Sequence, residues 1–106
     1  MTAGPLAGVR VAHVDEIPPG EGRAYAVDGS AVAVFRLRDG RLRAVDAVCP
    51  HAGGPLADGQ IDARVVICPL HQNTFDLTTG ECLTGAPPVR SWPVRVDDDG
   101  SVVVGG

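Results

Sequence analysis

Glycine and proline interrupt this chain so often that a long helix has no room to form. Fourteen Gly and nine Pro are spread over 106 residues, and the segments between them are short and rich in valine. Proline removes a backbone hydrogen-bond donor and glycine destabilises a helix interior, so both residues end helices early. β-Branched residues suit an extended strand. The sequence therefore predicts an all-β sandwich or barrel made of many short strands.

The clearest local signal is a hairpin at Asp39-Gly40. Two β-prone runs, Ala31–Arg38 and Arg41–Val45, flank this pair, and Asp-Gly is typical of a tight turn between antiparallel strands. Alternation along the runs predicts Leu37 and Leu42 on one face and the arginines on the other. Further strands are expected at Arg10–Val14, Arg23–Val27, Arg64–Ile67, Thr74–Leu77, Pro93–Val96 and Ser101–Val104.

Length, charge and cysteine content limit the class of protein. A chain of 106 residues with no visible boundary predicts one domain over residues 1–106. The net charge is −4 and the arginines form no block, so we expect no nucleic-acid partner. No apolar run approaches the roughly 18 residues of a membrane helix, and no secretion signal is visible. Three cysteines, an odd number, fit a reducing compartment. We expect a soluble, cytoplasmic protein with no membrane partner.

Two short motifs carry the functional information: Cys49-Pro50-His51 and, after 16 intervening residues, Cys68-Pro69-Leu70-His71. Each motif offers one thiolate and one imidazole beside a proline that stiffens the backbone. Each also follows a predicted strand, so two loops of a rigid sheet can bring four ligands to one centre. The glycines between the motifs allow a tight backbone beside such a centre.

Three interpretations of these motifs differ in the metal. Unligated cysteines and histidines would be the default for single residues, but two matched pairs argue against that interpretation. Structural zinc commonly takes two Cys and two His, but a Cys-x-His spacer is cramped if both side chains bind one ion. In a two-iron cluster two thiolates hold one iron and two imidazoles the other, so each loop sends one ligand to each metal. We favour the two-iron cluster.

The stretch from about Val9 to Val104 resembles the Rieske 2Fe-2S family. The resemblance rests on the two metal motifs and extends to three flanking segments: Ala52-Gly53-Gly54-Pro55-Leu56, Phe75-Asp76-Leu77-Thr78-Thr79-Gly80-Glu81 and Gly85-Ala86-Pro87-Pro88. It implies a Rieske-type antiparallel β sandwich with a small cluster-binding subdomain of two loops, at about residues 47–77. It also implies that one 2Fe-2S cluster is bound by Cys49 and Cys68 at the inner iron, and by His51 and His71 at the outer iron.

Within the family the chain is similar to soluble Rieske ferredoxins and to the small subunit of assimilatory NAD(P)H nitrite reductase. The first resemblance implies one-electron transfer from a flavin reductase to an oxygenase or reductase, with no catalytic residue in this chain. The second implies a subunit that works with a nitrite reductase large subunit. A zinc-stabilised interaction module is the alternative outside redox chemistry.

Other residues that could have metal or redox roles are assigned structural ones. We expect Cys82 to be a small half-buried thiol in a strand, because the four ligand positions are already filled. We expect His13 to be a surface or strand-packing residue.

Gln72 stands where respiratory relatives carry a serine, and its amide is a poorer hydrogen-bond donor to sulfur. We therefore expect a midpoint potential at the low end of the Rieske range.

Overall fold

A computed structural model describes residues 8–49, 54–70 and 72–105. In this part of the chain ten strands and two short 3-10 helices occur, and no α-helix does. The strands are β1 (Val9–His13), β2 (Glu21–Val27), β3 (Ser30–Arg36), β4 (Leu42–Asp46), β5 (Gln60–Asp62), β6 (Val65–Ile67), β7 (Thr74–Asp76), β8 (Ser91–Trp92), β9 (Val94–Val96) and β10 (Ser101–Val104). The 3-10 helices are η1 (Val14–Glu16) and η2 (Leu56–Asp58). The all-β prediction is confirmed. Across the described ranges, no helix has the length and hydropathy to cross a membrane.

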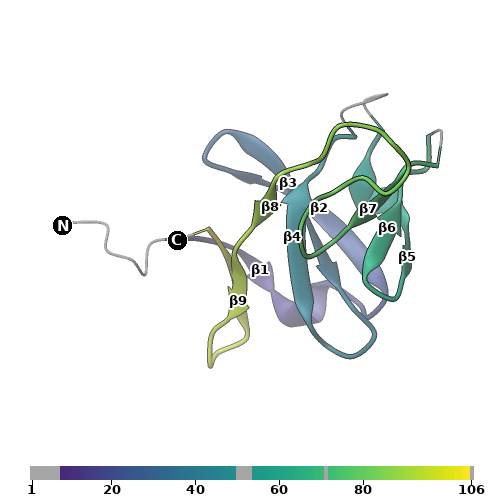
Figure 1. Cartoon of the computed structure of the whole chain (residues 1–106). Helices are drawn as coiled ribbons and strands as arrows, with labels where there is room; N and C mark the ends of the chain where they lie inside the picture. The colour runs from purple at the N-terminus through teal and green to yellow at the C-terminus, as the bar shows by residue number, and fades with distance from the viewer. Residues whose placement is uncertain (1–7, 50–53, 71, 106) are drawn as a thin grey trace.

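The strands form three antiparallel sheets, ordered β1-β10-β9, β2-β3-β4-β8 and β5-β6-β7. Figure 1 shows the four-stranded sheet in the middle, with the small β5-β6-β7 sheet on one side and β1 and β9 on the other. The small sheet lies within the range, about residues 47–77, where the family resemblance implied a cluster-binding subdomain. Two sequential hairpins build it, β5-β6 and β6-β7.

The four-stranded sheet is buried on both faces, which explains its run of apolar residues. One core contains Phe35 and Val45 from this sheet together with Val66 and Phe75 from the small sheet. The other core packs residues such as Val34 against the β1-β10-β9 sheet. A strand that is covered on both faces reads as a continuous apolar run rather than an alternating one.

This double burial corrects one prediction. Leu37 and Leu42 are both buried, but Leu37 belongs to the core shared with the small sheet and Leu42 to the opposite core. The two leucines therefore lie on opposite faces. Register explains the error: Leu42 pairs with Arg36, not with Leu37, and cross-strand partners share a face.

The predicted strands are present with ends shifted by at most two residues, and the Asp39-Gly40 hairpin joins β3 to β4. Two strands were missed, β5 and β8. Each offers a single large apolar residue, Ile61 in β5 and Trp92 in β8, so neither shows a repeating apolar pattern in the sequence. Strands β6, β7 and β9 are as short as β5, but each lies in a predicted run with at least two large apolar residues. Tertiary pairing creates them: β5 pairs with β6, and β8 with β4.

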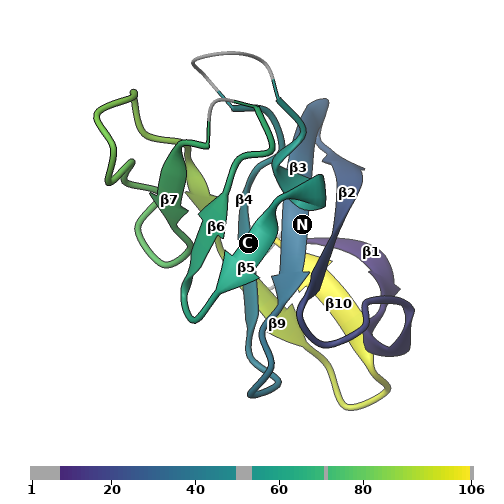
Figure 2. The same ribbon diagram turned by 90° about the vertical axis from the view of Figure 1, so that its right-hand side faces the viewer.

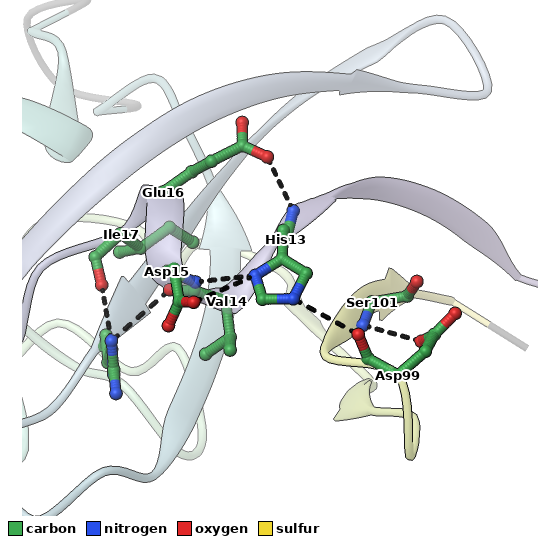
Figure 3. Close-up of polar contacts among 8 residues, drawn as sticks. His13, Val14, Asp15, Glu16, Ile17, Asp99 and Ser101 are labelled. Atoms are coloured by element: carbon green, nitrogen blue, oxygen red, sulfur yellow. Dashed lines mark hydrogen bonds and ion pairs between the residues drawn. The ribbon is translucent and has the colours of Figure 1, made fainter.

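His13 joins the first strand to the β9–β10 turn. Its Nε2 lies 3.1 Å from the carbonyl oxygen of Asp99, and its Nδ1 accepts a hydrogen bond from the backbone N–H of Asp15. Figure 3 shows the ring between these two segments. The Glu16 carboxylate accepts from the backbone N–H of His13 and completes a capping box around η1. The structure thus confirms a packing role for His13.

Gly80 ends the turn after β7 at a point where no side chain fits. Its φ is +82°, and an added Cβ would overlap the carbonyl oxygen of Val89, while the backbone N–H of Val89 donates to the Gly80 carbonyl at 2.9 Å. Gly29 has almost the same φ, +83°, but an added Cβ there meets nothing within 4 Å. Alanine substitutions at Gly29 and at Gly80 therefore separate the cost of backbone strain from the cost of steric overlap.

We expect Gly29→Ala to lower the free energy of unfolding by about 1 kcal/mol, the usual cost of a left-handed non-glycine residue. Gly80→Ala should cost about 2 kcal/mol more, because the overlap adds to the same backbone strain. Urea denaturation of both variants, prepared in the same way, measures the difference. Equal losses for the two alanines would contradict the close packing of Gly80 against Val89.

Candidate metal centre

Cys49 and Cys68 follow two strands that end on the same side of the molecule. Cys49 lies three residues after β4, and Cys68 comes directly after β6. Their exposed fractions are 1% and 0%, and both belong to the core between the four-stranded sheet and the small sheet. Packing of these two sheets therefore brings together two thiols that are nineteen positions apart in the sequence.

The two thiol groups are neighbours in the core between the sheets. Burial raises the pKa of Cys68; a backbone hydrogen bond from Leu70 opposes this effect, and a hydrogen bond to the Cys49 side chain raises the pKa further. All three cysteines of the chain are free thiols. Two buried, adjacent thiols that form no disulfide are the soft donor set that binds iron of a cluster, and the fit on the sulfur side is good.

Each cysteine is fixed by its own loop. The backbone N–H of Cys49 donates to the carbonyl oxygen of Gly54 at 2.9 Å, and that of Cys68 donates to the carbonyl oxygen of Asn73 at 2.8 Å. Both bonds join residues five positions apart, so each cysteine is tied to a residue that follows its motif.

Gly54 lets the two loops approach each other. An added Cβ at Gly54 would lie 2.8 Å from the sulfur of Cys68 and 3.2 Å from the side chain of Leu70. Any larger residue would push the first loop away from the second cysteine. This glycine was noted in the sequence only as an allowance for tight backbone, and the structure gives the specific contact.

His51 and His71, the two predicted imidazole ligands, lie outside the described residues, as does Pro50. Within the described ranges, no group of three or more His, Cys, Asp and Glu is arranged to hold a metal ion. The cysteine pair is thus the half of the predicted ligand set that the structure locates. Gln72, which follows His71, is exposed and has a φ of +58°, and its predicted effect on the potential stays a prediction.

A third segment is bound to the second loop. The Thr84 hydroxyl donates to the side-chain oxygen of Asn73 at 2.8 Å, and the backbone N–H of Leu83 donates to the Thr74 carbonyl at 2.7 Å. Asn73 is the residue whose carbonyl accepts from Cys68. The segment that begins at Cys82 and leads to the predicted Gly85–Pro88 loop is therefore held beside the second cysteine.

Cys82 has a separate environment. It is half-buried, as predicted, but it lies at an isolated bridge to Phe75 rather than in a strand. Burial alone would raise its pKa, but hydrogen bonds from Thr84, and then from Ala86 and Gly85, lower the pKa of this thiol overall. These hydrogen bonds tie the Cys82 thiol to residues of its own segment.

Comparisons with known proteins agree on one family. Residues 7–96 match the family described as the Rieske [2Fe-2S] domain. A ferredoxin component of naphthalene 1,2-dioxygenase/salicylate 5-hydroxylase systems from Ralstonia sp is 30% identical over 92 residues, which cover 85% of this chain and 88% of that protein.

Two solved structures have the same fold. The ferredoxin of carbazole 1,9a-dioxygenase from Nocardioides aromaticivorans IC177 superposes with a TM-score of 0.84 at 37% identity, over 93% of this chain and 97% of its own. A candidate NADH-dependent nitrite reductase small subunit from Mycobacterium tuberculosis gives 0.87 at 32% identity, over 92% and 93%.

The chain therefore belongs to the Rieske 2Fe-2S family. Its cofactor is a 2Fe-2S cluster, and its function is one-electron transfer by a protein of the ferredoxin type. The fold is the antiparallel β fold that the sequence resemblance implied. The paired thiols at the end of β4 and β6 fit the cysteine side of such a centre.

The close approach of Gly54 to Cys68 generates a prediction. Gly54→Ala should lower the iron and acid-labile sulfide content of purified protein by more than half, because the new methyl group displaces the sulfur of Cys68. Gly40→Ala is the control, since φ is +94° there and an added Cβ meets nothing within 4 Å. A Gly54→Ala protein with full iron content would contradict the proposed role of this contact.

Proposed function

We propose that this protein carries single electrons from a flavoprotein reductase to a terminal oxygenase. Similarity to dioxygenase ferredoxins over nearly the whole chain supports this role. The redox partners dock at the end of the molecule that holds the cysteines, because electron transfer requires a short path. The carrier works in the cytoplasm, since three cysteines that form no disulfide are typical of a reducing compartment.

The cluster ligands in this proposal are Cys49 and Cys68 at the inner iron and His51 and His71 at the outer iron. The burial of both thiols in one core supports the cysteine half. The motifs Cys-x-His and Cys-x-x-His support the histidine half. The ligands belong to one domain over residues 1–106, with the cluster-binding part at about residues 47–77. Histidine ligation makes the bound cluster easier to reduce than an all-cysteine cluster.

Exposed apolar side chains at the cysteine end are the observation that most supports transient docking. Val48 is 51% exposed, Leu70 46% and Leu83 59%, and each belongs to a different one of the three segments that meet near the cysteines. Only one other large apolar side chain in the described residues is exposed to a similar extent, Val96 at 44% in β9. We call Val48, Leu70 and Leu83 the apolar rim. Exposed apolar groups of this kind are typical of protein interaction sites.

A second candidate role is that of small subunit in an NAD(P)H-dependent nitrite reductase. The superposition on the Mycobacterium tuberculosis protein favours it. The two roles differ in lifetime of the complex: a carrier dissociates after each electron, whereas a subunit stays bound. Tandem affinity purification from the native host distinguishes them, because a stable complex with a large flavin- and haem-containing chain occurs only for the subunit.

The ligand assignment predicts which substitutions remove the cluster. Cys49→Ser, Cys68→Ser, His51→Ala and His71→Ala should each lose most of the visible absorbance and iron, because a missing ligand opens the coordination shell. Matched controls exist for both residue types: Cys82→Ser and His13→Asn should keep full iron content. Loss of iron in Cys82→Ser with retention in Cys68→Ser would overturn the assignment.

The electron paramagnetic resonance spectrum of the reduced protein checks the histidine half separately. A mixed Cys and His cluster has a lower average g-value than an all-cysteine cluster. A spectrum of the all-cysteine type, or a zinc-containing colourless protein, would refute the proposed centre.

The apolar rim predicts a kinetic effect without a change in potential. Leu70→Ser combined with Leu83→Ser should raise the KM of a partner reductase for this protein by roughly tenfold, since each buried leucine contributes about 1.5–3 kcal/mol at most and docking uses part of it. Val96→Ser is the matched control and should leave KM unchanged. A midpoint potential that shifts together with KM would indicate damage to the centre rather than to docking.

A further inference from the structure

A pocket of about 620 Å³ lies between the β3–β4 hairpin and the β5–β6 turn. The residues that line it come from the hairpin and from the small sheet with its following turn: Leu37, Arg38, Asp39, Arg41, Arg43, Ile61, Asp62, Ala63, Arg64 and Thr78. Its volume is in the range of pockets that bind small organic molecules.

The pocket is basic although the chain is acidic. Four of the nine arginines of the chain line it, against two of the thirteen acidic residues, while the whole chain has a net charge of −4. Arg41 lies 3.4 Å from the Asp39 carboxylate. Within the described residues, Arg38, Arg43 and Arg64 form no ion pair shorter than 4 Å. Three guanidinium groups at one pocket are thus left without a counter-ion.

Arg43 is the half-buried member of this group. Its Nη1 donates to the carbonyl oxygen of Leu42 at 2.8 Å, which fixes the side chain, and its Nε is buried with no hydrogen-bond partner in the described part of the chain. A cation held partly out of water without an anionic partner is unfavourable. An anion bound in the pocket would reduce this cost.

The walls of the pocket also contain apolar groups. Leu37 and Ile61 line it while belonging to the core between the sheets, so they are held rigidly. Ala63 lines the pocket from the β5–β6 turn and immediately precedes Arg64. The φ of Ala63 is +54°, in the left-handed region. Guanidinium groups match planar carboxylate or phosphate oxygens, and the apolar wall suits a hydrocarbon body.

The pocket lies away from the cysteines. Arg43 is near the start of β4 and Cys49 follows its end; Arg64 precedes β6 and Cys68 follows it. Four residues of strand span about 13 Å. Figure 2 shows the β3–β4 hairpin and the β5–β6 turn at the lower end, opposite the ends of β4 and β6 that lead into the cysteines. A ligand here leaves the docking end free.

We propose that this pocket binds a small organic anion, with a carboxylate or phosphate group on the arginines and an apolar body against Leu37 and Ile61. The proposal does not depend on which redox partner the protein serves. The site is distinct from the metal centre, so its failure would leave the electron-transfer function unaffected.

Isothermal titration calorimetry of the holoprotein with benzoate and with phenyl phosphate tests the proposal. We expect saturable binding of at least one of the two, and the tighter one identifies the anionic group. Benzyl alcohol, which lacks the charge, and inorganic phosphate, which lacks the apolar body, should each bind at least tenfold more weakly. Chemical-shift changes should centre on the amides of residues 37–43 and 61–64.

Substitutions of two pocket arginines test where the small anion binds. Arg38→Gln combined with Arg64→Gln should weaken binding by roughly tenfold or more, because both side chains are exposed cations and a charge-assisted hydrogen bond contributes at least that factor. Arg23→Gln, in β2 and paired with Glu21, is the matched control and should bind as the parent does. Iron content and unfolding midpoint show that each variant is folded.

Three results would overturn the proposal. The first is no saturable binding of either anion up to 20 mM, taken as roughly the weakest affinity of functional interest. The second is equal binding by benzyl alcohol or by inorganic phosphate. The third is a glutamate-rich peptide that binds more tightly than both small anions, which would make the pocket a docking site for an acidic protein segment.

Discussion

The burial of two neighbouring thiols, Cys49 and Cys68, in one core is the constraint on which the rest of this structure depends. It exists because the small β5-β6-β7 sheet packs on one face of the four-stranded sheet, so that β4 and β6 end side by side. Phe35 and Phe75 are fully buried in that interface, and each would cost about 3–5 kcal/mol if reduced to alanine. The metal centre is therefore built on core packing, and the loops need only carry the ligands a few residues further.

This arrangement gives the molecule two chemically different ends. The end with the cysteines carries the apolar rim of Val48, Leu70 and Leu83, which suits brief contact with a redox partner. The other end collects four of the nine arginines around a pocket. Because the two ends lie at opposite ends of β4 and β6, a protein partner and a small anion can be bound at the same time. An electron carrier needs only the first end, so the second end is an additional property of this chain.

Sequence reasoning succeeded where the signal was local and failed where burial depended on a distant layer. The Asp39-Gly40 hairpin was predictable because the turn residues themselves require that geometry. The faces of Leu37 and Leu42 were not, since Leu42 pairs with Arg36 and this register places the two leucines on opposite faces, each covered by a different core. β5 and β8 were missed because each has one large apolar residue and no local pattern, and only pairing with β6 and with β4 makes them strands.

The sequence by itself determined the chemistry: two Cys and His pairs, their spacing, and the resemblance that the family match confirmed. It also determined the all-β class, because glycine, proline and β-branched residues restrict the backbone locally. Only the tertiary structure decided that Gly54 must lack a side chain beside Cys68, and that Arg38, Arg43 and Arg64 share one pocket. The physical reason is that ligand type is a property of single residues. Close approach and shared charge are properties of segments that meet only when separate sheets pack together.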